Sequence, residues 1–305
     1  MKTNSIEIDA ITGAGPEISI DEFRLLNQLP KEIGNSLLTG FLNGKSLGLS
    51  ERKSIANYFR NHSFISRVLM KDPGTFEMLE VIYTGENVHG AIDNYLFNAV
   101  SSKALQNRLS SVIVKTGEIV QKKLADKENL NLKILNLGSG TGRDTIGVLS
   151  KGTFDNSVFV ECVDIDYMAL EKAKVLAREN AVEKNFKFVE GSLTKLSYRN
   201  EIDIGLMIGI LCGLPSRVCM IVLRKMKKYF KKGAKLIVSN VLQTMQEQDP
   251  FMAYLLDVII GWKLVYKTPK QLQEIVKEAG YQWEGIFYDE PTRFHGMAIC
   301  SVPLS

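Results

Sequence analysis

Residues 135–144 read Leu135-Asn136-Leu137-Gly138-Ser139-Gly140-Thr141-Gly142-Arg143-Asp144. The apolar run 133–137 predicts a short strand, and the pattern after residue 143 predicts a helix. The three alternating glycines therefore lie where a strand turns into a helix. Glycine lets the backbone turn sharply and approach a ligand closely, where a Cβ would clash. We expect a ligand-binding turn here, with the first N–H groups of the helix free to hold an anionic group.

On the C-terminal side of this turn, short apolar strands alternate with helical patterns, which is typical of a parallel sheet. The strands are expected at 133–137, 158–163, 186–189, 202–210 and 234–238. Two last strands, at 283–288 and 297–302, are joined by a short polar connection and are predicted to form a hairpin. We predict an α/β, Rossmann-like, mostly parallel sheet with an antiparallel C-terminal strand.

On the N-terminal side, from about residue 17 to 126, the pattern is helical and no strand is predicted. Ser19 and Glu22 have the spacing of a capping box, and the longest helix is expected at 102–124. We predict an all-helical N-terminal cap or substrate region over 1–127 and a sheet domain over 128–305. Because only a few polar residues near 126–129 separate the two, we expect the helices to close over the strand ends.

The composition of the 305 residues excludes several classes of protein. No apolar run reaches about 18 residues, so no membrane span is expected, and the polar residues 1–5 do not begin a secretory signal. Single cysteines are typical of a reducing cytoplasm, and scattered histidines give no metal signature. A lysine-rich helix near 224–232 lacks interleaved aromatic residues, so we expect a solvated face and no nucleic acid. Its apolar face is predicted at every fourth position: Val218, Val222, Met226 and Phe230.

The spacing of the glycines bears on the kind of ligand. Asp164 ends the second strand about twenty residues after the loop, as a ribose-binding carboxylate does in nucleotide-binding α/β folds. Dinucleotide enzymes require a third glycine at position 143, where this chain has Arg143. The third glycine falls at 142 instead, which argues against a nicotinamide or flavin cofactor.

The pattern Gly138-x-Gly140-x-Gly142, with Val163-Asp164-Ile165-Asp166 after the second strand, resembles the class I S-adenosylmethionine-dependent methyltransferase family. The resemblance covers about residues 130–305, including the terminal hairpin. It implies that the glycine loop approaches the methionine part of S-adenosylmethionine, and that Asp164 bonds the ribose hydroxyls. Gly191-Ser192-Leu193 matches the family's adenine-side turn, although many members have an aspartate where this chain has Ser192. The implied cofactor contacts are Gly138, Ser139, Gly140, Thr141, Gly142, Asp164, Ile165, Ser192, Leu193, Ile208 and Tyr95.

The methyl acceptor is less closely defined. Enzymes that methylate amino groups of nucleic acids often carry Asn/Asp-Pro-Pro-Tyr/Phe after the fourth strand, whereas residues 209–214 here are Gly-Ile-Leu-Cys-Gly-Leu. These apolar residues favour a small, lipid-like acceptor. A looser resemblance, over 257–268 and the helix carrying Tyr95 and Arg108, is to methyltransferases that esterify 3-hydroxy fatty acids. A carboxylate acceptor needs no base; a hydroxyl acceptor needs one, and His295, Tyr95 and His89 are the candidates.

Three other functions share parts of this pattern. An aminocarboxypropyl transferase would use the same fold and cofactor, and a non-catalytic cofactor-binding protein would need no base. A nicotinamide-dependent oxidoreductase is disfavoured by Arg143. Asp166 fits either a cofactor contact or the N-cap of the following helix.

Overall fold

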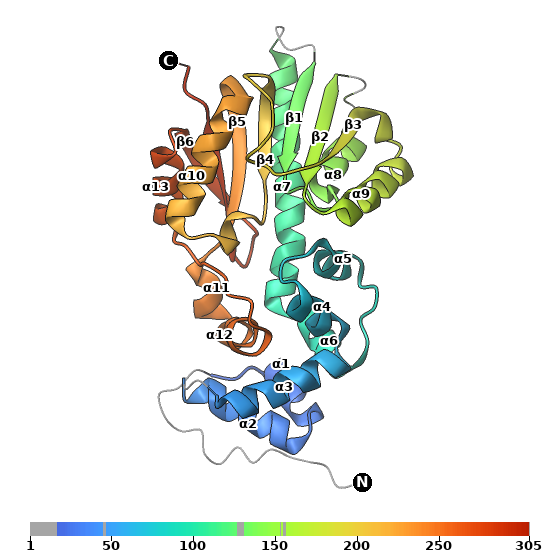
Figure 1. Ribbon diagram of the computed structural model, residues 1–305, viewed down its shortest axis with the longest axis vertical. Coiled ribbons are helices and arrows are strands. Elements are labelled where there is room, and N and C mark those ends of the chain that lie inside the picture. Colours follow the sequence, from blue (N-terminus) through green and yellow to red (C-terminus); the bar gives the residue numbers. More distant parts are fainter. Residues whose placement is uncertain (1–16, 45–46, 127–130, 153, 155–156, 305) are drawn as a thin grey trace. The chain divides into compact units, whose positions relative to one another are not determined.

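The computed structural model describes residues 17–44, 47–126, 131–152, 154 and 157–304 (Figure 1). The chain forms two compact units, each described by itself. Unit 1 comprises Met1–Lys103 and Thr244–Lys263, and unit 2 comprises Ala104–Gln243 and Leu264–Ser305. The sequence predicted a domain boundary at residue 127. Residues 127–130, which contain this junction, lie outside the described residues. The structure instead groups most of the long helix with the sheet, because the helix supplies part of the sheet's core.

Unit 2 is built on a seven-stranded sheet in the order β3-β2-β1-β4-β5-β7-β6. Its strands are β1 (Leu132–Leu137), β2 (Val158–Asp164), β3 (Phe186–Glu190), β4 (Ile202–Met207), β5 (Phe230–Val241), β6 (Gln282–Tyr288) and β7 (His295–Ser301). The first five strands pair in parallel, whereas β7 is antiparallel to both β5 and β6. The predicted Rossmann-like sheet with a C-terminal hairpin is therefore confirmed.

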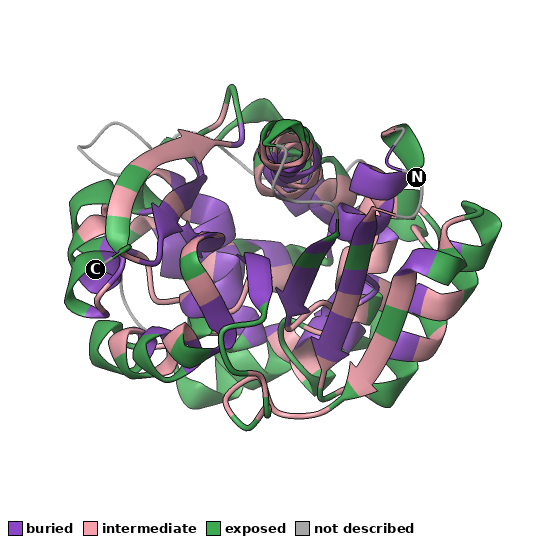
Figure 2. Ribbon diagram, turned by 90° about the horizontal axis from the view of Figure 1, so that it is seen from above, coloured by how far each residue is buried: buried purple, intermediate pink, exposed green. Residues whose placement is uncertain are grey.

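Helices cover both faces of this sheet, because successive strand residues point to opposite sides. One face packs against α7 (Val100–Ala125), α8 (Arg143–Lys151) and α9 (Tyr167–Glu179). The other packs against α10 (Ser216–Met226) and α13 (Pro269–Glu278). The central strand β4 is buried along its whole length, and the edge strands β3 and β6 are only partly covered (Figure 2).

Short 3₁₀ turns complete unit 2, at Glu183–Asn185, Leu211–Gly213 and Lys227–Tyr229. The connection from β3 to β4, residues 191–201, contains no helix. The predicted cap of α13 is confirmed, since Thr268 accepts from the N–H of Gln271 and Pro269 is the first helical residue.

Two details of the sequence prediction are wrong. The fourth strand ends at Met207, not at residue 210, because Gly209 adopts a left-handed φ of 82° that a strand does not contain. Of the predicted apolar face of α10, Met226 is buried and Val222 packs against the core, but Val218 is exposed, and Cys219 and Leu223 complete the buried face instead. Positions spaced by four alone drift around a helix of 3.6 residues per turn, so a buried face needs spacings of both three and four.

Among the described residues of unit 1, all regular secondary structure is helical, as predicted. Its first stretch forms α1 (Ile20–Gln28), α2 (Lys31–Leu42), α3 (Leu49–His62), α4 (Phe64–Lys71), α5 (Phe76–Thr84) and α6 (Gly90–Asn98). The second adds α11 (Gln243–Gln248), α12 (Pro250–Tyr254) and a π-helical turn (Leu255–Ile260). The capping box at Ser19 is present: its N–H donates to Glu22 Oε2 at 2.6 Å, and its Oγ accepts from the Glu22 N–H at 3.3 Å.

The two stretches of unit 1 meet through aromatic rings. Phe251 of α12 packs edge-on against Phe41 of α2, with ring centroids 5.1 Å apart. It packs in the same way against Tyr95 of α6, at 6.2 Å. Among the described residues, every helix is either too short or too polar to traverse a lipid bilayer.

Candidate functional site

The glycine loop joins β1 to α8 and is shaped by left-handed backbone. Gly138, Gly140 and Gly142 have φ values of 64°, 53° and 64°, a region that glycine adopts without the penalty of a Cβ. A Cβ on Gly138 would collide with the side chain of Ile210, whose Cγ1 lies 2.8 Å from the Cβ position. The side chain of Ile210, in the loop after β4, therefore packs directly against the glycine loop.

The N–H groups of this loop are largely engaged within the protein. Those of Gly138 and Ser139 both donate to the carbonyl of Val163, at 2.8 and 3.1 Å, and that of Gly142 donates to the Ser139 carbonyl at 2.9 Å. The N–H of Gly140 donates to Asp164 Oδ2 at 2.7 Å. The loop fixes the shape of the turn rather than offering a row of free donors.

The first turn of α8 carries a buried carboxyl group of its own. The buried carboxylate of Asp144 accepts from the N–H of Thr145 and from the amide of Asn136, both at 2.7 Å. Burial raises the pKa of Asp144, and these two hydrogen bonds and the charge of Arg108 oppose that rise. The N–H of Thr145 in the first turn of α8 is therefore bonded to Asp144 rather than open to a ligand anion.

Asp164 links the glycine loop to the end of β2. Its Oδ2 accepts from Gly140 and its Oδ1 accepts from the N–H of Asp166 at 3.0 Å. A carboxylate has about four acceptor sites, so two lone pairs remain for ligand hydroxyls. Asp166 is the N-cap of α9, where it accepts from the N–H groups of Met168 and Ala169. Of the two roles expected for Asp166, the N-cap of the following helix is the one observed.

The remaining predicted residues of unit 2 lie along the same carboxyl edge of the sheet. Ile165, directly after Asp164, is 77% exposed. The turn containing Ser192 and Leu193 is tied to β2, since the N–H of Gly191 donates to the Asp164 carbonyl at 2.8 Å. Ile208 follows β4 and packs partly against the core. In open α/β sheets ligands bind at this edge, where the strand order reverses, here between β1 and β4.

Charged side chains also gather beside the end of β4. The guanidinium of Arg108, on α7, lies at Gly209: its Nη1 and Nη2 are 3.6 and 3.9 Å from the position a Cβ would take there. Arg108 and His295 are each only 6% exposed. The Nδ1 of His295 is 3.4 Å from Asp289 Oδ2, and its backbone N–H donates to Asp289 Oδ1.

His295 is held neutral by its surroundings. Burial lowers its pKa, the nearby carboxylate of Asp289 opposes this, and the charge of Arg108 lowers the pKa further. A neutral imidazole can accept a proton, so His295 keeps the chemistry of a base candidate. The other two candidates belong to unit 1. Burial raises the pKa of Tyr95 far above its ordinary value, which makes it a donor rather than a base, and His89 is an exposed N-cap residue of α6.

Lys267 is a buried cation that sequence reasoning missed. It is 1% exposed, and its Nζ donates to the carbonyls of Leu211 and Leu214 at 3.1 and 3.0 Å. It also donates to Asn240 Oδ1 and to the Val265 carbonyl, at 3.0 and 3.2 Å. Lys267 therefore fixes the turn after Gly209 to the end of β5. The signal in the sequence was a lysine between apolar residues 264–265 and the cap at Thr268.

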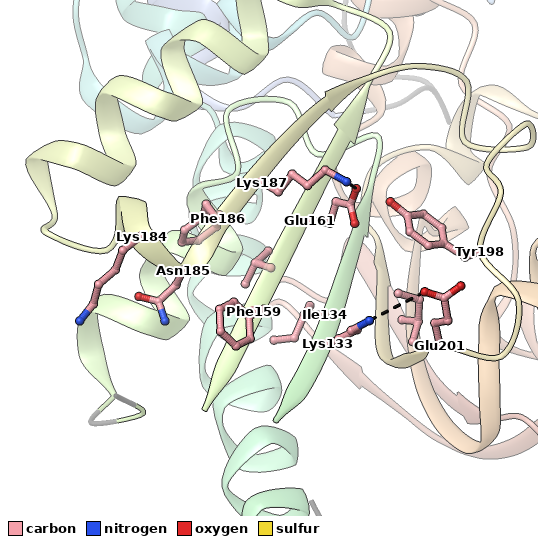
Figure 3. A pocket seen from close by; sticks show the side chains of 12 residues that line it. Lys133, Ile134, Phe159, Glu161, Lys184, Asn185, Phe186, Lys187, Tyr198 and Glu201 are labelled. Carbon is pink, nitrogen blue, oxygen red and sulfur yellow. Dashed lines mark hydrogen bonds and ion pairs between the residues drawn. The ribbon is translucent and has the colours of Figure 1, made fainter. Parts of the chain in front are cut away.

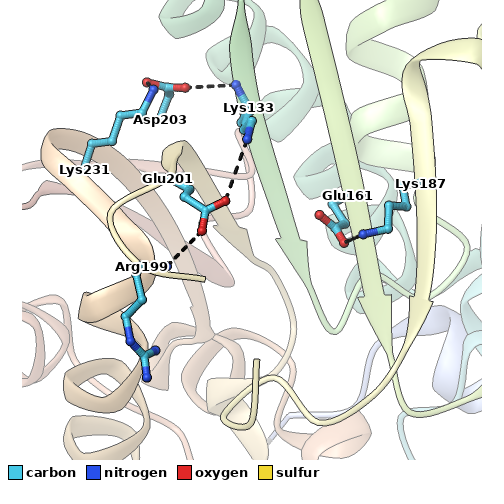
Figure 4. Close-up of polar contacts among 7 residues, drawn as sticks. All are labelled: Lys133, Glu161, Lys187, Arg199, Glu201, Asp203 and Lys231. Carbon is cyan, nitrogen blue, oxygen red and sulfur yellow. Dashed lines mark hydrogen bonds and ion pairs between the residues drawn. The ribbon is translucent and has the colours of Figure 1, made fainter. Parts of the chain in front are cut away.

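The structure also has a cavity of about 320 Å³ at the other end of the strands (Figure 3). It is lined by the first residues of β1, β3 and β4 and the first half of β2. Two ion pairs line it, Lys187 with Glu161 at 2.7 Å and Lys133 with Glu201 at 3.8 Å, and Lys184 lies at its edge. Asp203 accepts from the Lys133 N–H at 3.0 Å in the same network (Figure 4). Because ligands of such sheets bind at the carboxyl ends, this cavity is separate from the candidate site. No group of three or more potential metal ligands occurs among the residues for which side chains are described.

Comparisons with known proteins agree with this geometry. The family model "Methyltransferase domain" matches residues 128–280. No curated protein matches the sequence. The fold is similar to that of a possible exported protein from Bordetella parapertussis, at 17% identity and a TM-score of 0.66, over 93% of this chain and 96% of that chain. It is also similar to magnesium protoporphyrin IX methyltransferase from Synechocystis with bound S-adenosylhomocysteine, at 14% identity and a TM-score of 0.55, over 78% of this chain and 99% of that one.

Proposed function

The chain belongs to the class I S-adenosylmethionine-dependent methyltransferase family, and from this premise we propose that it methylates a small, apolar molecule at a carboxyl or hydroxyl oxygen. Its cofactor is S-adenosylmethionine. The observation that supports this acceptor is the turn after β4, where Ile210, Leu211 and Leu214 follow Gly209 and pack into or against the apolar core. A flat polar base would find no matching donors or acceptors among these side chains.

The residues at the carboxyl edge fit the cofactor. The three glycines hold the loop in left-handed backbone at the carboxyl edge of the sheet, and Asp164 keeps lone pairs for hydroxyl groups. Bound S-adenosylmethionine supplies an activated methyl group on its sulfonium. The chain itself has to align the acceptor and exclude water. For a hydroxyl acceptor, the neutral imidazole of His295 supports a role as proton acceptor.

Unit 1 is proposed as the substrate region. In support, no nucleotide-binding turn occurs among its described residues. Two stretches of the chain form it, one before β1 in the sequence and one after β5. We further propose a cytoplasmic location, which is supported by four free cysteines, three of them buried.

Thermal denaturation with S-adenosylhomocysteine and with NADH in parallel tests the cofactor. S-adenosylhomocysteine at about 100 times its dissociation constant should stabilise the protein by about 2.7 kcal/mol, an easily measured shift. NADH should give no shift, because residue 143 is arginine where a dinucleotide loop needs glycine. Stabilisation by NADH alone would exclude a methyltransferase. For the acceptor, mass spectrometry of fatty acids incubated with S-adenosylmethionine separates transfer of a methyl group from transfer of an aminocarboxypropyl group.

Asp164→Ala should weaken S-adenosylhomocysteine binding by about 1.5–3 kcal/mol, roughly ten- to a hundredfold, since hydrogen bonds to a charged group are of that size. Calorimetric titration measures the change. The fold should survive, because Asp164 is half-buried at the end of a strand. Asp164→Asn is the matched variant: it keeps the acceptor for Gly140 but not the charge, and it should lose less. Wild-type affinity in folded Asp164→Ala would remove Asp164 from the site.

A further inference from the structure

Positive charge is concentrated in one segment of unit 2. Residues 216–232, which contain α10 and the start of β5, carry seven lysine or arginine side chains and no acidic one. The whole chain has a net charge of only +4, so the rest of the chain is net negative. A local excess of cations of this kind indicates attraction to a polyanion, either a nucleic acid or an anionic membrane surface.

Helix α10 presents much of this charge on one exposed side. Its other side is buried against the sheet of unit 2 (Figure 1). The exposed residues recur at helical spacing and continue into the 3₁₀ turn after the helix. We call them the cationic face of α10: Arg217, Val218, Ile221, Arg224, Lys225 and Lys228. Val218 is 38% and Ile221 44% exposed, so two aliphatic side chains lie among four cations.

The positive charge of this face is not neutralised within the protein. In the part of the chain that the structure describes, none of the four cations forms an ion pair with an acidic side chain. Arg224 donates to the backbone carbonyl of Glu278 at 2.8 Å, and Lys228 lies 5.5 Å from the ring centre of Tyr229. Both contacts leave the charge in place. The neighbouring helix α13 exposes two cations and two acids, so it adds no net charge: Lys270, Lys277, Glu274 and Glu278.

The apolar residues of the face distinguish between the two kinds of polyanion. Single-stranded nucleic acids are bound by exposed aromatic rings on which the bases stack. The two aromatic residues of segment 216–232, Tyr229 and Phe230, are both buried. At a bilayer, aliphatic side chains enter the boundary between headgroups and acyl chains while neighbouring cations attract anionic headgroups. Exposed Val218 and Ile221 among cations therefore favour a lipid surface.

We propose that the cationic face of α10 docks the protein on an anionic lipid bilayer. The contact is peripheral and uses charge together with two shallowly inserted aliphatic side chains. It goes beyond the proposed function and does not rest on it, since no residue assigned to the cofactor takes part. For an acceptor that is lipid-like, the docked enzyme is held at the bilayer in which such a molecule dissolves.

Co-sedimentation with lipid vesicles tests the docking surface. One set of vesicles is phosphatidylcholine alone, and the other contains about one third phosphatidylglycerol, which is anionic. The variants are the double substitution Lys225→Glu with Lys228→Glu, and Ile221→Gln. Lys151→Glu with Lys172→Glu is the matched control: it makes the same change of charge at exposed lysines of α8 and α9, on the other face of the sheet. Circular dichroism and titration with S-adenosylhomocysteine check that each variant is folded.

Wild type should bind the anionic vesicles and bind phosphatidylcholine only weakly. Lys225→Glu with Lys228→Glu should lose affinity for the anionic vesicles by roughly thirtyfold or more. The control pair should stay within about threefold of wild type, because charges far from the bilayer are screened. Ile221→Gln should lose about three- to tenfold without a change of charge.

Three results would overturn the proposal. The first is equal binding of wild type to both kinds of vesicle. The second is an equal loss in the α10 pair and the control pair, which would assign the effect to net charge alone. The third is binding of a short single-stranded RNA, measured by fluorescence anisotropy, by a protein that does not bind the anionic vesicles. Failure of wild type to bind S-adenosylhomocysteine would contradict the proposed function and leave the docking result standing.

Discussion

Gly138→Val is expected to lower the affinity for S-adenosylhomocysteine by about 3 kcal/mol or more, roughly a hundredfold, and to abolish methyl transfer. Gly138 has a φ of 64°, which a β-branched residue adopts only with strain. Its Cβ would also meet Ile210, whose Cγ1 is 2.8 Å from the Cβ position. Relieving this overlap requires the Ile210 side chain or the loop to move, and a movement of the loop breaks its hydrogen bonds to Val163.

Calorimetric titration and circular dichroism together check this result. Gly138→Ala should show a smaller loss, since alanine brings one carbon rather than three. Gly117→Ala is the control: Gly117 lies within α7, and no atom is within 4 Å of its Cβ position. Its affinity should equal that of wild type. Tight binding by folded Gly138→Val would mean that the loop does not contact the cofactor.

Lys267→Met is expected to lower the free energy of unfolding by about 3 kcal/mol, measured by urea denaturation. Methionine fills a similar volume but donates nothing, so it leaves the carbonyls of Leu211 and Leu214 and the side chain of Asn240 buried without this donor. Loss of the desolvated charge offsets part of this cost. Lys270→Met, at an exposed position on α13, should change stability by less than about 0.5 kcal/mol.

The effect of Lys267 should also depend on pH. Burial lowers the pKa of Lys267 below its ordinary value of 10.5, so between the two values the unfolded chain binds more protons than the folded one. The stability of the wild type relative to Lys267→Met should therefore rise with pH towards 10.5 and fall as the pH drops through the lowered pKa. If the difference in unfolding free energy between wild type and Lys267→Met stays constant with pH, Lys267 titrates as it does in the unfolded chain.

Much of unit 2 could be predicted because its central strands are largely buried and apolar along their length. The strand expected at 133–137 is observed at Leu132–Leu137, and the strand expected at 158–163 at Val158–Asp164. The same apolar character led the sequence prediction to place the end of β4 three residues too late. Ile208 and Ile210 are as apolar as the strand before them, and only the left-handed φ of Gly209 ends it.

The polar part of the site was less predictable, because its partners are far apart in sequence. The sequence identified Asp164 by its place after a strand, but not its bond to Gly140, 24 residues earlier. Lys267 and its acceptor Leu211 are 56 residues apart. A motif states which residue types surround a turn. It does not state which buried donor meets which acceptor, since that depends on how the elements pack.

The division of unit 1 into two stretches has a consequence for the order of synthesis. Phe41 and Tyr95 leave the ribosome early, but their partner Phe251 follows only after the chain of β1 to β5 has been made. The nascent helices therefore keep an uncovered aromatic surface while more than half of the remaining chain is translated. Such a surface binds chaperones or other nascent chains. The part of the protein that is synthesised first is thus completed late, and its yield in the cell should be more sensitive to the pace of translation than that of a unit made from one continuous stretch.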